Sequence, residues 1–220
     1  MAKLSLEVNS FLILVGSLSY NTAPKSDLSL LISEVLRLNN FVAGEGMNVS
    51  TAAGQTGGIW KTTNGGSSWT RQNTASYNSS GSFTNVVHFW DENYGFAQGD
   101  PIGGEYELYV TSDGGNNWEA VPGENIPNPG GGEYGYVGQI EVVGDNIWYT
   151  TNTTTLYHST DKGNNWQAYQ CPVNDFSGDA ISFSDANNGI IVSGTNSETN
   201  VYRTYDSGEN WTQIDPNGPV

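Results

Sequence analysis

The sequence predicts an all-β fold, a β-propeller of about four blades, on three observations. First, an eight-residue frame occurs four times, as TTNGGSSW, TSDGGNNW, STDKGNNW and TYDSGENW. Second, the copies recur about every 45–49 residues, a period that fits one four-stranded propeller blade. Third, 28 Gly, 12 Tyr and 7 Trp favour many short strands joined by tight turns.

Each frame is predicted to be the turn of a β-hairpin. Apolar or alternating residues precede it, as in ELYVT and TLYHS, and short strand-like segments such as NWEAV and NWQAY follow it. A second pattern, Asp-x-Asn-x-Gly, occurs in FWDENYGF (89–96) and FSDANNGI (183–190) and predicts another hairpin within the same blade. IEVVGDNIWYTT (140–151) is a shorter version of this hairpin. Three fairly complete blades are therefore expected between residues 81 and 214.

The propeller is expected to cover residues 41–220, after an extension at 1–40. Within the extension, leucine, isoleucine and valine at helical spacing predict an amphipathic helix over 26–40. Residues 11–18, FLILVGSL, form a signal-like apolar run, but the run is short and Glu7 stands where a signal peptide is basic. A signal peptide is therefore not convincing. The frames lie at 62–69, 111–118, 159–166 and 204–211.

The number of blades leaves three arrangements open. The chain could close as a small four-bladed ring, with residues 1–40 completing the first blade. It could be a partial propeller that pairs with another copy through an open blade edge, because unpaired strand edges invite pairing. It could also be a piece of a longer gene product.

The repeated frame resembles the Asp-box, or bacterial neuraminidase repeat, S/T-x-D-x-G-x-x-W. This repeat is found in sialidases, sortilin-type receptors, some xyloglucan hydrolases and a group of photosystem assembly factors. The resemblance is greatest to secreted bacterial proteins of the sortilin-like or photosystem-assembly-factor-like kind. It implies that the boxes lie at the rim and are structural, without a catalytic or calcium-binding role.

The residue types of the box have a mechanical explanation. The acidic or amide residue can accept hydrogen bonds from backbone N–H groups of its own turn, and the glycine can adopt a positive φ. The tryptophan is then expected to fold back between adjacent sheets, where an indole buries on the order of 150–250 Å². The first box departs from the pattern, with Asn64 in place of Asp. The predicted structural residues are Asn64, Trp69, Asp113, Trp118, Asp161, Trp166, Asp206 and Trp211.

Composition excludes several classes of function. A net charge of −16 opposes binding to nucleic acids or anionic membranes, and the apolar run is too short to insert across a bilayer. Cys171 is the only cysteine, so neither an intrachain disulfide nor a cysteine zinc site can form. His88 and His158 are the only histidines, and each is more simply a packed residue of a strand. We expect no metal and no cofactor.

Sialidase activity is not expected. Members of that family bind the sialic acid carboxylate with three convergent arginines, whereas this chain has only Arg37, Arg71 and Arg203, which lie in separate predicted elements. Other glycoside hydrolases need two carboxylates facing one sugar ring, and the abundance of acids here does not discriminate.

The candidate ligand-binding residues lie in two glycine-rich loops, GDPIGGE and GEYGY. Loops on a rigid β scaffold are where binding residues concentrate, although simple turn chemistry also explains these stretches. The tyrosines could stack on sugar rings and the acids could accept hydroxyl hydrogen bonds. We predict a non-catalytic binding or scaffold module, secreted or on a bacterial cell surface, that recognises a glycan or protein partner. The alternatives are a glycoside hydrolase of the sialidase-like superfamily, or a fragment of one, and a photosystem-assembly-factor-like protein. The candidate residues are Asp100, Glu105, Glu133, Tyr134 and Tyr136.

Overall fold

A computed structural model describes most of the predicted β domain. The described residues are 41–45, 57–61, 68, 70–75, 77, 81–176, 180–195 and 198–215. The predicted extension 1–40, with its helix and signal-like run, lies outside them, as do Asn64 and Trp69 of the first box. Where residues are described, none forms a helix long and apolar enough to span a membrane.

The strands form four antiparallel sheets, and in each sheet the strand order follows the chain. The three later sheets have four strands each, as a propeller blade requires, while three strands are described in the first. The strands are β1 (Phe41–Glu45), β2 (Gly57–Lys61) and β3 (Thr70–Gln72); β4 (Thr84–Phe89), β5 (Gly95–Ile102), β6 (Glu105–Thr111) and β7 (Glu119–Ala120); β8 (Gly135–Val143), β9 (Asn146–Thr151), β10 (Thr155–Ser159) and β11 (Gln167–Gln170); and β12 (Ala180–Phe183), β13 (Gly189–Thr195), β14 (Glu198–Thr204) and β15 (Thr212–Ile214).

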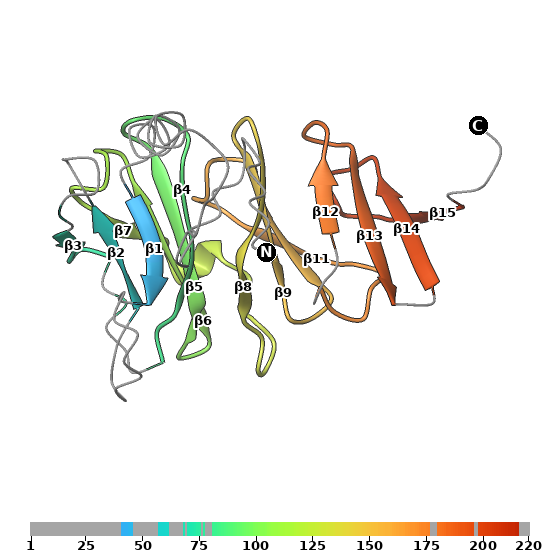
Figure 1. Cartoon of the computed structure of the whole chain (residues 1–220), viewed down its shortest axis with the longest axis horizontal. Coiled ribbons are helices and arrows are strands. Elements are labelled where there is room, and N and C mark those ends of the chain that lie inside the picture. Colours follow the sequence, from blue (N-terminus) through green and yellow to red (C-terminus); the bar gives the residue numbers. More distant parts are fainter. Residues whose placement is uncertain are drawn as a thin grey trace, which may run out of the picture.

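The sheets follow one another in chain order, from β1–β3 to β12–β15 (Figure 1). Their first strands are in contact in succession, β1 with β4, β4 with β8, and β8 with β12, as the innermost strands of neighbouring blades are. Among the described residues, no comparable contact joins β12 to β1. The prediction of an all-β propeller with about four blades is confirmed, and the blades form an open row.

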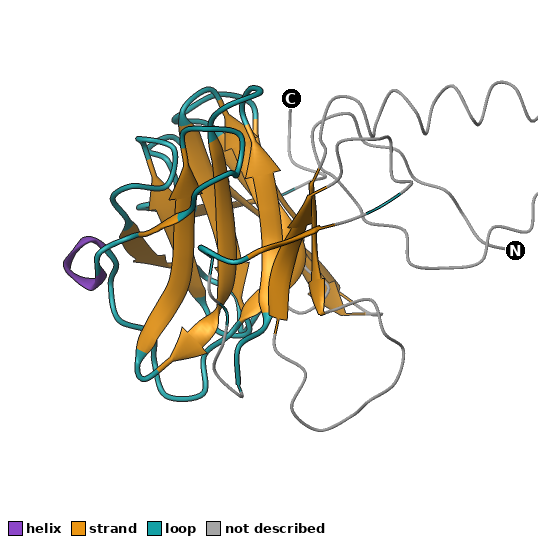
Figure 2. Ribbon diagram, turned by 90° about the vertical axis from the view of Figure 1, so that its left-hand side faces the viewer, coloured by secondary structure: helices purple, strands orange, loops and turns teal. Residues whose placement is uncertain are grey.

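The two predicted hairpin patterns lie at the same end of the sheets. The Asp-boxes join β6 to β7, β10 to β11 and β14 to β15, and the Asp-x-Asn-x-Gly turns join β4 to β5 and β12 to β13. We call this the box end. The opposite end, called the loop end, carries the β5–β6 and β9–β10 turns and residues 130–134, the last part of the segment 121–134 between β7 and β8. Within that segment, the 3₁₀ helix η1 (Gly123–Asn125) lies at the outer margin of the sheets (Figure 2).

Three described boxes share one set of hydrogen bonds. In the third box, the carboxylate of Asp161 accepts from the Ser159 hydroxyl at 2.8 Å and from the backbone and side-chain amides of Asn165 at 2.9 and 2.7 Å. The Ser159 hydroxyl also accepts from the Gly163 N–H at 2.9 Å. Asp113 and Asp206 repeat these bonds with Asn117 and Asn210. The self-bonded turn predicted from the sequence is therefore present.

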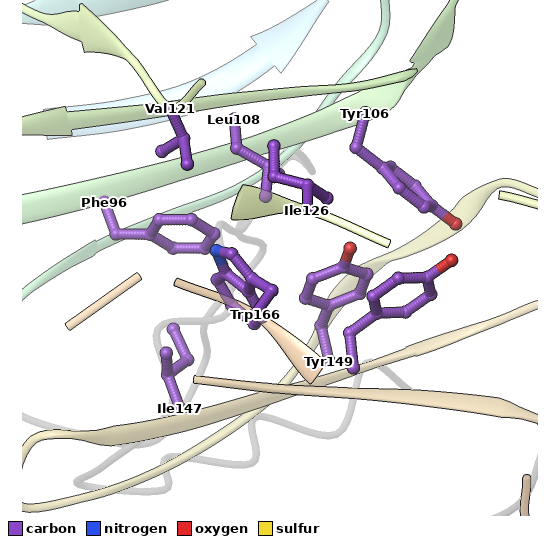
Figure 3. Close-up of a cluster of buried hydrophobic side chains, with 9 residues drawn as sticks. Phe96, Tyr106, Leu108, Val121, Ile126, Ile147, Tyr149 and Trp166 are labelled. Carbon is purple, nitrogen blue, oxygen red and sulfur yellow. The ribbon is translucent and has the colours of Figure 1, made fainter. Parts of the chain in front are cut away.

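The box tryptophans pack against the preceding sheet. Trp166, which is 6% exposed, lies 5.3 Å from Phe96 of the second sheet and 5.0 Å from Tyr149 of its own, measured between ring centroids (Figure 3). Trp118 belongs to a cluster with Ile59 of the first sheet, and Trp211 packs on the cluster between the third and fourth sheets. These three indoles therefore lie between neighbouring sheets.

Each of these turns contains a second residue with a positive φ, which the box pattern does not reveal. The residue before the box glycine has φ of 68° at Gly114, 58° at Lys162 and 64° at Ser207. Two consecutive left-handed residues are strained for side chains other than glycine. Bonds to neighbouring turns and sheets hold two of these residues in place. Trp148 of the third sheet donates its indole N–H to the Ser207 carbonyl of the fourth sheet at 2.8 Å, and Lys162 pairs with Asp145, in the β8–β9 turn of its own sheet, at 3.6 Å.

Replacing Asp161 by alanine is expected to lower the free energy of unfolding by about 1–2 kcal/mol, because the Ser159 and Asn165 donors lose their acceptor. Asp161→Asn keeps one acceptor oxygen and is expected to cost less. Urea unfolding of the two variants and the wild type measures the difference. Equal losses in both variants would contradict a role for the carboxylate as a multiple acceptor.

Candidate functional site

The loop end between the second and third sheets brings together three segments distant in sequence. Tyr134 donates its backbone N–H to the Asn152 side-chain oxygen at 2.8 Å, and its carbonyl accepts the Asn152 N–H at 3.0 Å. The Asn152 side chain also donates to the Gly132 carbonyl at 3.1 Å. These bonds fix residues 132–134 against the β9–β10 turn.

Asp100 joins the second sheet to the third. One of its carboxylate oxygens accepts from the Asn85 side chain at 2.7 Å and from the Gly135 backbone N–H at 3.1 Å. Asp100 is half-buried, and this burial raises the pKa of its carboxyl above the usual value, against the effect of the two hydrogen bonds. The side chain therefore positions the start of β8 on the end of β5.

Glu133 is buried, with 7% of its surface exposed. Its carboxylate accepts from the Gly130 backbone N–H at 2.7 Å and from the Thr153 hydroxyl at 3.3 Å. A buried carboxylate is costly unless donors satisfy it, and here both donors come from the chain itself. Glu133 therefore closes the glycine-rich loop onto the β9–β10 turn.

Three tyrosines that sequence reasoning missed lie beside these acids. The Tyr106 ring stands 5.4 Å from the Tyr149 ring and 5.1 Å from the Tyr157 ring, centroid to centroid. Burial raises the pKa of Tyr106 strongly, and the charges of Glu133 and Asp100 raise it further. We call Asp100, Glu133, Tyr106, Tyr149 and Tyr157 the tyrosine–carboxylate cluster.

The interface that holds this cluster is polar near the loop end and apolar toward the box end. The hydroxyl of Tyr149 and the side-chain oxygen of Gln98 are buried, and no described residue forms a hydrogen bond with either of them. In Figure 3, Phe96, Leu108 and Trp166 continue the same interface. The position of Tyr157, two residues before the box, is aromatic in all four repeats, and this is the one sequence signal for the cluster.

The remaining candidate residues lie near the protein surface at this end. Tyr134 is 45% exposed, and its ring meets that of the half-buried Tyr136 edge-on at 5.8 Å. Glu105 is exposed and its carboxylate lies against the Gly123 backbone. The structure thus holds Asp100 and Glu133 in hydrogen bonds on either side of Tyr134, and leaves Tyr134 and Glu105 accessible.

The two described arginines lie in other sheets than the cluster. Arg71, on β3, lies over the Trp60 ring at 5.8 Å, and Arg203, on β14, lies over the Tyr205 ring at 4.4 Å. Arg37 lies outside the described residues. The described part of the chain therefore does not present convergent arginines to a carboxylate at this site.

The two histidines are placed in different sheets, His88 on β4 and His158 on β10. Over the described residues, no three His, Cys, Asp or Glu side chains are grouped in a way that could hold a metal ion. A shallow polar pocket lies at the box end between the first two sheets, lined by Lys61, Ser68, Thr70, Gln72 and Asn116. It is remote from the candidate residues.

One family profile and several solved structures are similar to this chain. The profile of the Sortilin-Vps10 family, described as sortilin, neurotensin receptor 3, matches residues 106–218, just over half of the chain. No curated protein matches.

Among solved structures, YCF48 bound to D1 peptide shares 20% identity at a TM-score of 0.43 over 60% of this chain. YCF48 from Cyanidioschyzon merolae shares 20% identity at 0.41 over 60%. A GH74 xyloglucanase from Xanthomonas campestris shares 14% at 0.49 over 80%. The chain spans 40%, 37% and 28% of the lengths of these three proteins.

Four sheets in an open row, with the three described boxes at one end, agree with the profile match, which covers the third and fourth sheets and the last two strands of the second. The chain therefore belongs to the Sortilin-Vps10 family of β-propeller proteins.

Proposed function

We propose that the protein is a binding module that recognises a basic segment of a protein partner at the loop end. The observation that carries this proposal is that two candidate residues are occupied by hydrogen bonds within the protein, while a third is exposed. Asp100 and Glu133 are held by donors of their own chain, whereas Tyr134 is exposed above them. The family is named after a receptor, which also favours binding over catalysis.

The hydrogen bonds that Asp100 and Glu133 already accept favour a role in positioning the loops over a role in catalysis. A general acid or nucleophile needs a carboxylate oxygen that can reach the substrate. At Glu133 both oxygens accept hydrogen bonds from the protein, and at Asp100 one oxygen accepts two. Their role in this proposal is to hold the three loop-end segments in a fixed relation.

The accessible surface has the character of a protein-binding surface. Tyr134 and Val137, 45% and 67% exposed, flank the start of β8. A register shift between Gly135 and Ile140 makes β8 bulge away from β9, and Gly138 in the bulge has φ of 72° and open space around it. Exposed tyrosine supplies large contact area with little loss of conformational entropy, which suits an interface anchor.

The net negative charge of the chain favours a positively charged partner. With 23 acidic and 7 basic residues, the protein attracts cationic segments over a distance of about 8–10 Å at physiological salt. Glu105 at the loop end adds an exposed carboxylate to this field. We infer that a segment rich in lysine or arginine fits this surface better than an acidic or neutral one.

Tyr134→Ala is expected to weaken binding of basic peptides at least about tenfold, the loss typical of a truncated interface anchor. The measurement uses immobilised peptides of graded net charge and, separately, an array of neutral and acidic oligosaccharides. Tyr169→Ala, on the outer strand of the third sheet, is the matched control and is expected to leave binding unchanged.

Two outcomes would overturn the proposal. Binding of oligosaccharides alone, reduced by Tyr134→Ala, would assign the surface to glycans. Oligosaccharide cleavage that disappears in Asp100→Asn would instead make the cluster the active site of a hydrolase, with Asp100, whose pKa is raised, as the acid.

A further inference from the structure

The β9–β10 turn carries a row of hydroxyl groups, with the sequence TTNTTT over residues 150–155. The hydroxyl oxygen of Thr153 lies 3.3 Å from Oε1 of Glu133, 3.0 Å from the hydroxyl oxygen of Thr155 and 2.9 Å from that of Thr151. Glu133 and Thr155 are each 7% exposed, and Thr151 is fully buried. The row therefore leads from the buried carboxylate of Glu133 into the start of β10.

The row continues onto the outer strand of the third sheet. Gln170 on β11 pairs with Thr155 on β10, and its side-chain N–H donates to the Thr155 hydroxyl at 3.2 Å. The side-chain oxygen of Gln170 accepts a hydrogen bond from the Thr154 hydroxyl. Because Gln170 is exposed, the row connects the surface of the sheet with a carboxylate at the loop end.

The direction of each hydrogen bond follows from the number of hydrogens. A hydroxyl has one hydrogen to donate, and a carboxylate has none. Thr153 therefore donates its hydrogen to Glu133, and Thr155 must supply the hydrogen of the bond between the two threonines. Thr155 in turn accepts from the Gln170 amide. In this chain, called the hydroxyl chain, each member donates to the next, in the order Thr154, Gln170, Thr155, Thr153 and Glu133.

The hydroxyl chain ends on the residue that closes the glycine-rich loop. Hydrogen bonds that run in one direction strengthen one another, and a bond to a carboxylate is stronger than one between neutral groups. The second carboxylate oxygen of Glu133 accepts the Gly130 N–H at 2.7 Å. The carboxylate is thus held by Thr153 on one side and holds the loop on the other. Tyr134 is the next residue along the chain.

We propose that Thr153 and Gln170 are positioning residues of the loop-end surface. Thr153 acts through Glu133, and Gln170 acts through Thr155, to hold residues 130–134 in the conformation that presents Tyr134 to a partner. This inference rests on the proposed function, because it concerns the same surface. It adds that the affinity of that surface depends on side chains of β10 and β11 that lie outside the candidate residues.

Thr153→Val tests the central bond, because valine keeps the shape of threonine and has no hydrogen to donate. Amide hydrogen exchange of Gly130 in the protein without peptide is expected to become about tenfold faster, the ratio that corresponds to loss of one hydrogen bond to a charged group. Affinity for the basic peptides is expected to fall about threefold to tenfold, with unchanged circular dichroism. Thr153→Ser retains the hydroxyl and is expected to match the wild type in both measurements.

Gln170→Ala tests the exposed start of the hydroxyl chain. The change is expected to have the same direction and to be about twofold, because Thr155 and Thr153 keep their hydroxyls and lose only the strengthening that Gln170 supplies. Gln213→Ala is the matched control. Gln213 is an exposed glutamine on the outer strand of the fourth sheet, and its side chain donates to Asn200 at 2.8 Å. This variant is expected to leave Gly130 exchange and peptide affinity unchanged.

The two measurements separate this inference from the proposed function. Unchanged Gly130 exchange in Thr153→Val would overturn the inference, and so would an equal increase in Thr153→Ser, because the hydroxyl would then not be responsible. Faster exchange without any loss of peptide affinity would also overturn it, since the loop would not govern binding. A wild type that binds none of the basic peptides, with exchange rates that respond as expected, would support the positioning of the loop and overturn the proposed function alone.

Discussion

Replacing Trp166 by alanine is expected to lower the free energy of unfolding by about 3–5 kcal/mol. The indole is 6% exposed, packs between Phe96 and Tyr149, and donates its N–H to the Gly163 carbonyl at 2.9 Å. Its removal leaves a cavity between the second and third sheets, in the largest of the three buried clusters. Urea unfolding followed by circular dichroism measures the loss.

Trp211 is the matched control for this prediction. It makes the same hydrogen bond to Gly208 at 2.9 Å, but it is half-buried and lies on the last sheet. Trp211→Ala is therefore expected to cost clearly less than Trp166→Ala. Equal losses at the two positions would mean that the box turn, and not inter-sheet burial, accounts for the contribution of the tryptophan.

Acid is expected to destabilise the protein between about pH 6.5 and pH 4 through His88 and His158. Burial lowers the pKa of both imidazoles from 6.5 to about 4. In this range the unfolded chain binds protons that the folded chain does not, so the stabilisation is complete above pH 6.5 and falls as the pH decreases. A shift of this size corresponds to up to about 3 kcal/mol for each histidine. Urea unfolding at pH 7, 5 and 4 measures it.

His158→Phe separates this effect from the carboxylates. His158 is 3% exposed and stacks on Trp148 at 4.5 Å, so phenylalanine preserves the ring contact and cannot titrate. The variant is expected to lose less stability than the wild type on going from pH 7 to pH 4. A wild-type slope in the variant would exclude His158 as a source of the pH dependence.

The box carboxylates act in a lower pH range. Hydrogen bonds from the Asn117 backbone and side chain lower the pKa of Asp113, and those from Asn210 lower the pKa of Asp206. Their stabilisation is present above their usual value of 3.8 and is lost as the pH falls through the lowered value. The histidine and carboxylate contributions are thus separable in one pH series.

The candidate site was only partly predictable from the sequence. Asp100, Glu133 and Tyr134 were found because glycine-rich loops between strands mark surface turns. Tyr106 and Tyr149 were missed because they sit within strands, where alternation marks them only as core residues. Their proximity to the acids arises from packing of β6 against β9 and β10, and no local pattern encodes contact between separate sheets.

The sequence by itself determined the repeat and the self-bonded hairpin turns of the three described boxes, since these depend on residues within eight positions of one another. Only the tertiary structure decided which face of each sheet is covered, because burial of Phe96 and exposure of Ile190 at the same register position depend on whether another sheet follows. It also decided that Asp100 and Glu133 are held by Gly135 and Gly130, because hydrogen-bond partners are set by how the loops meet in space.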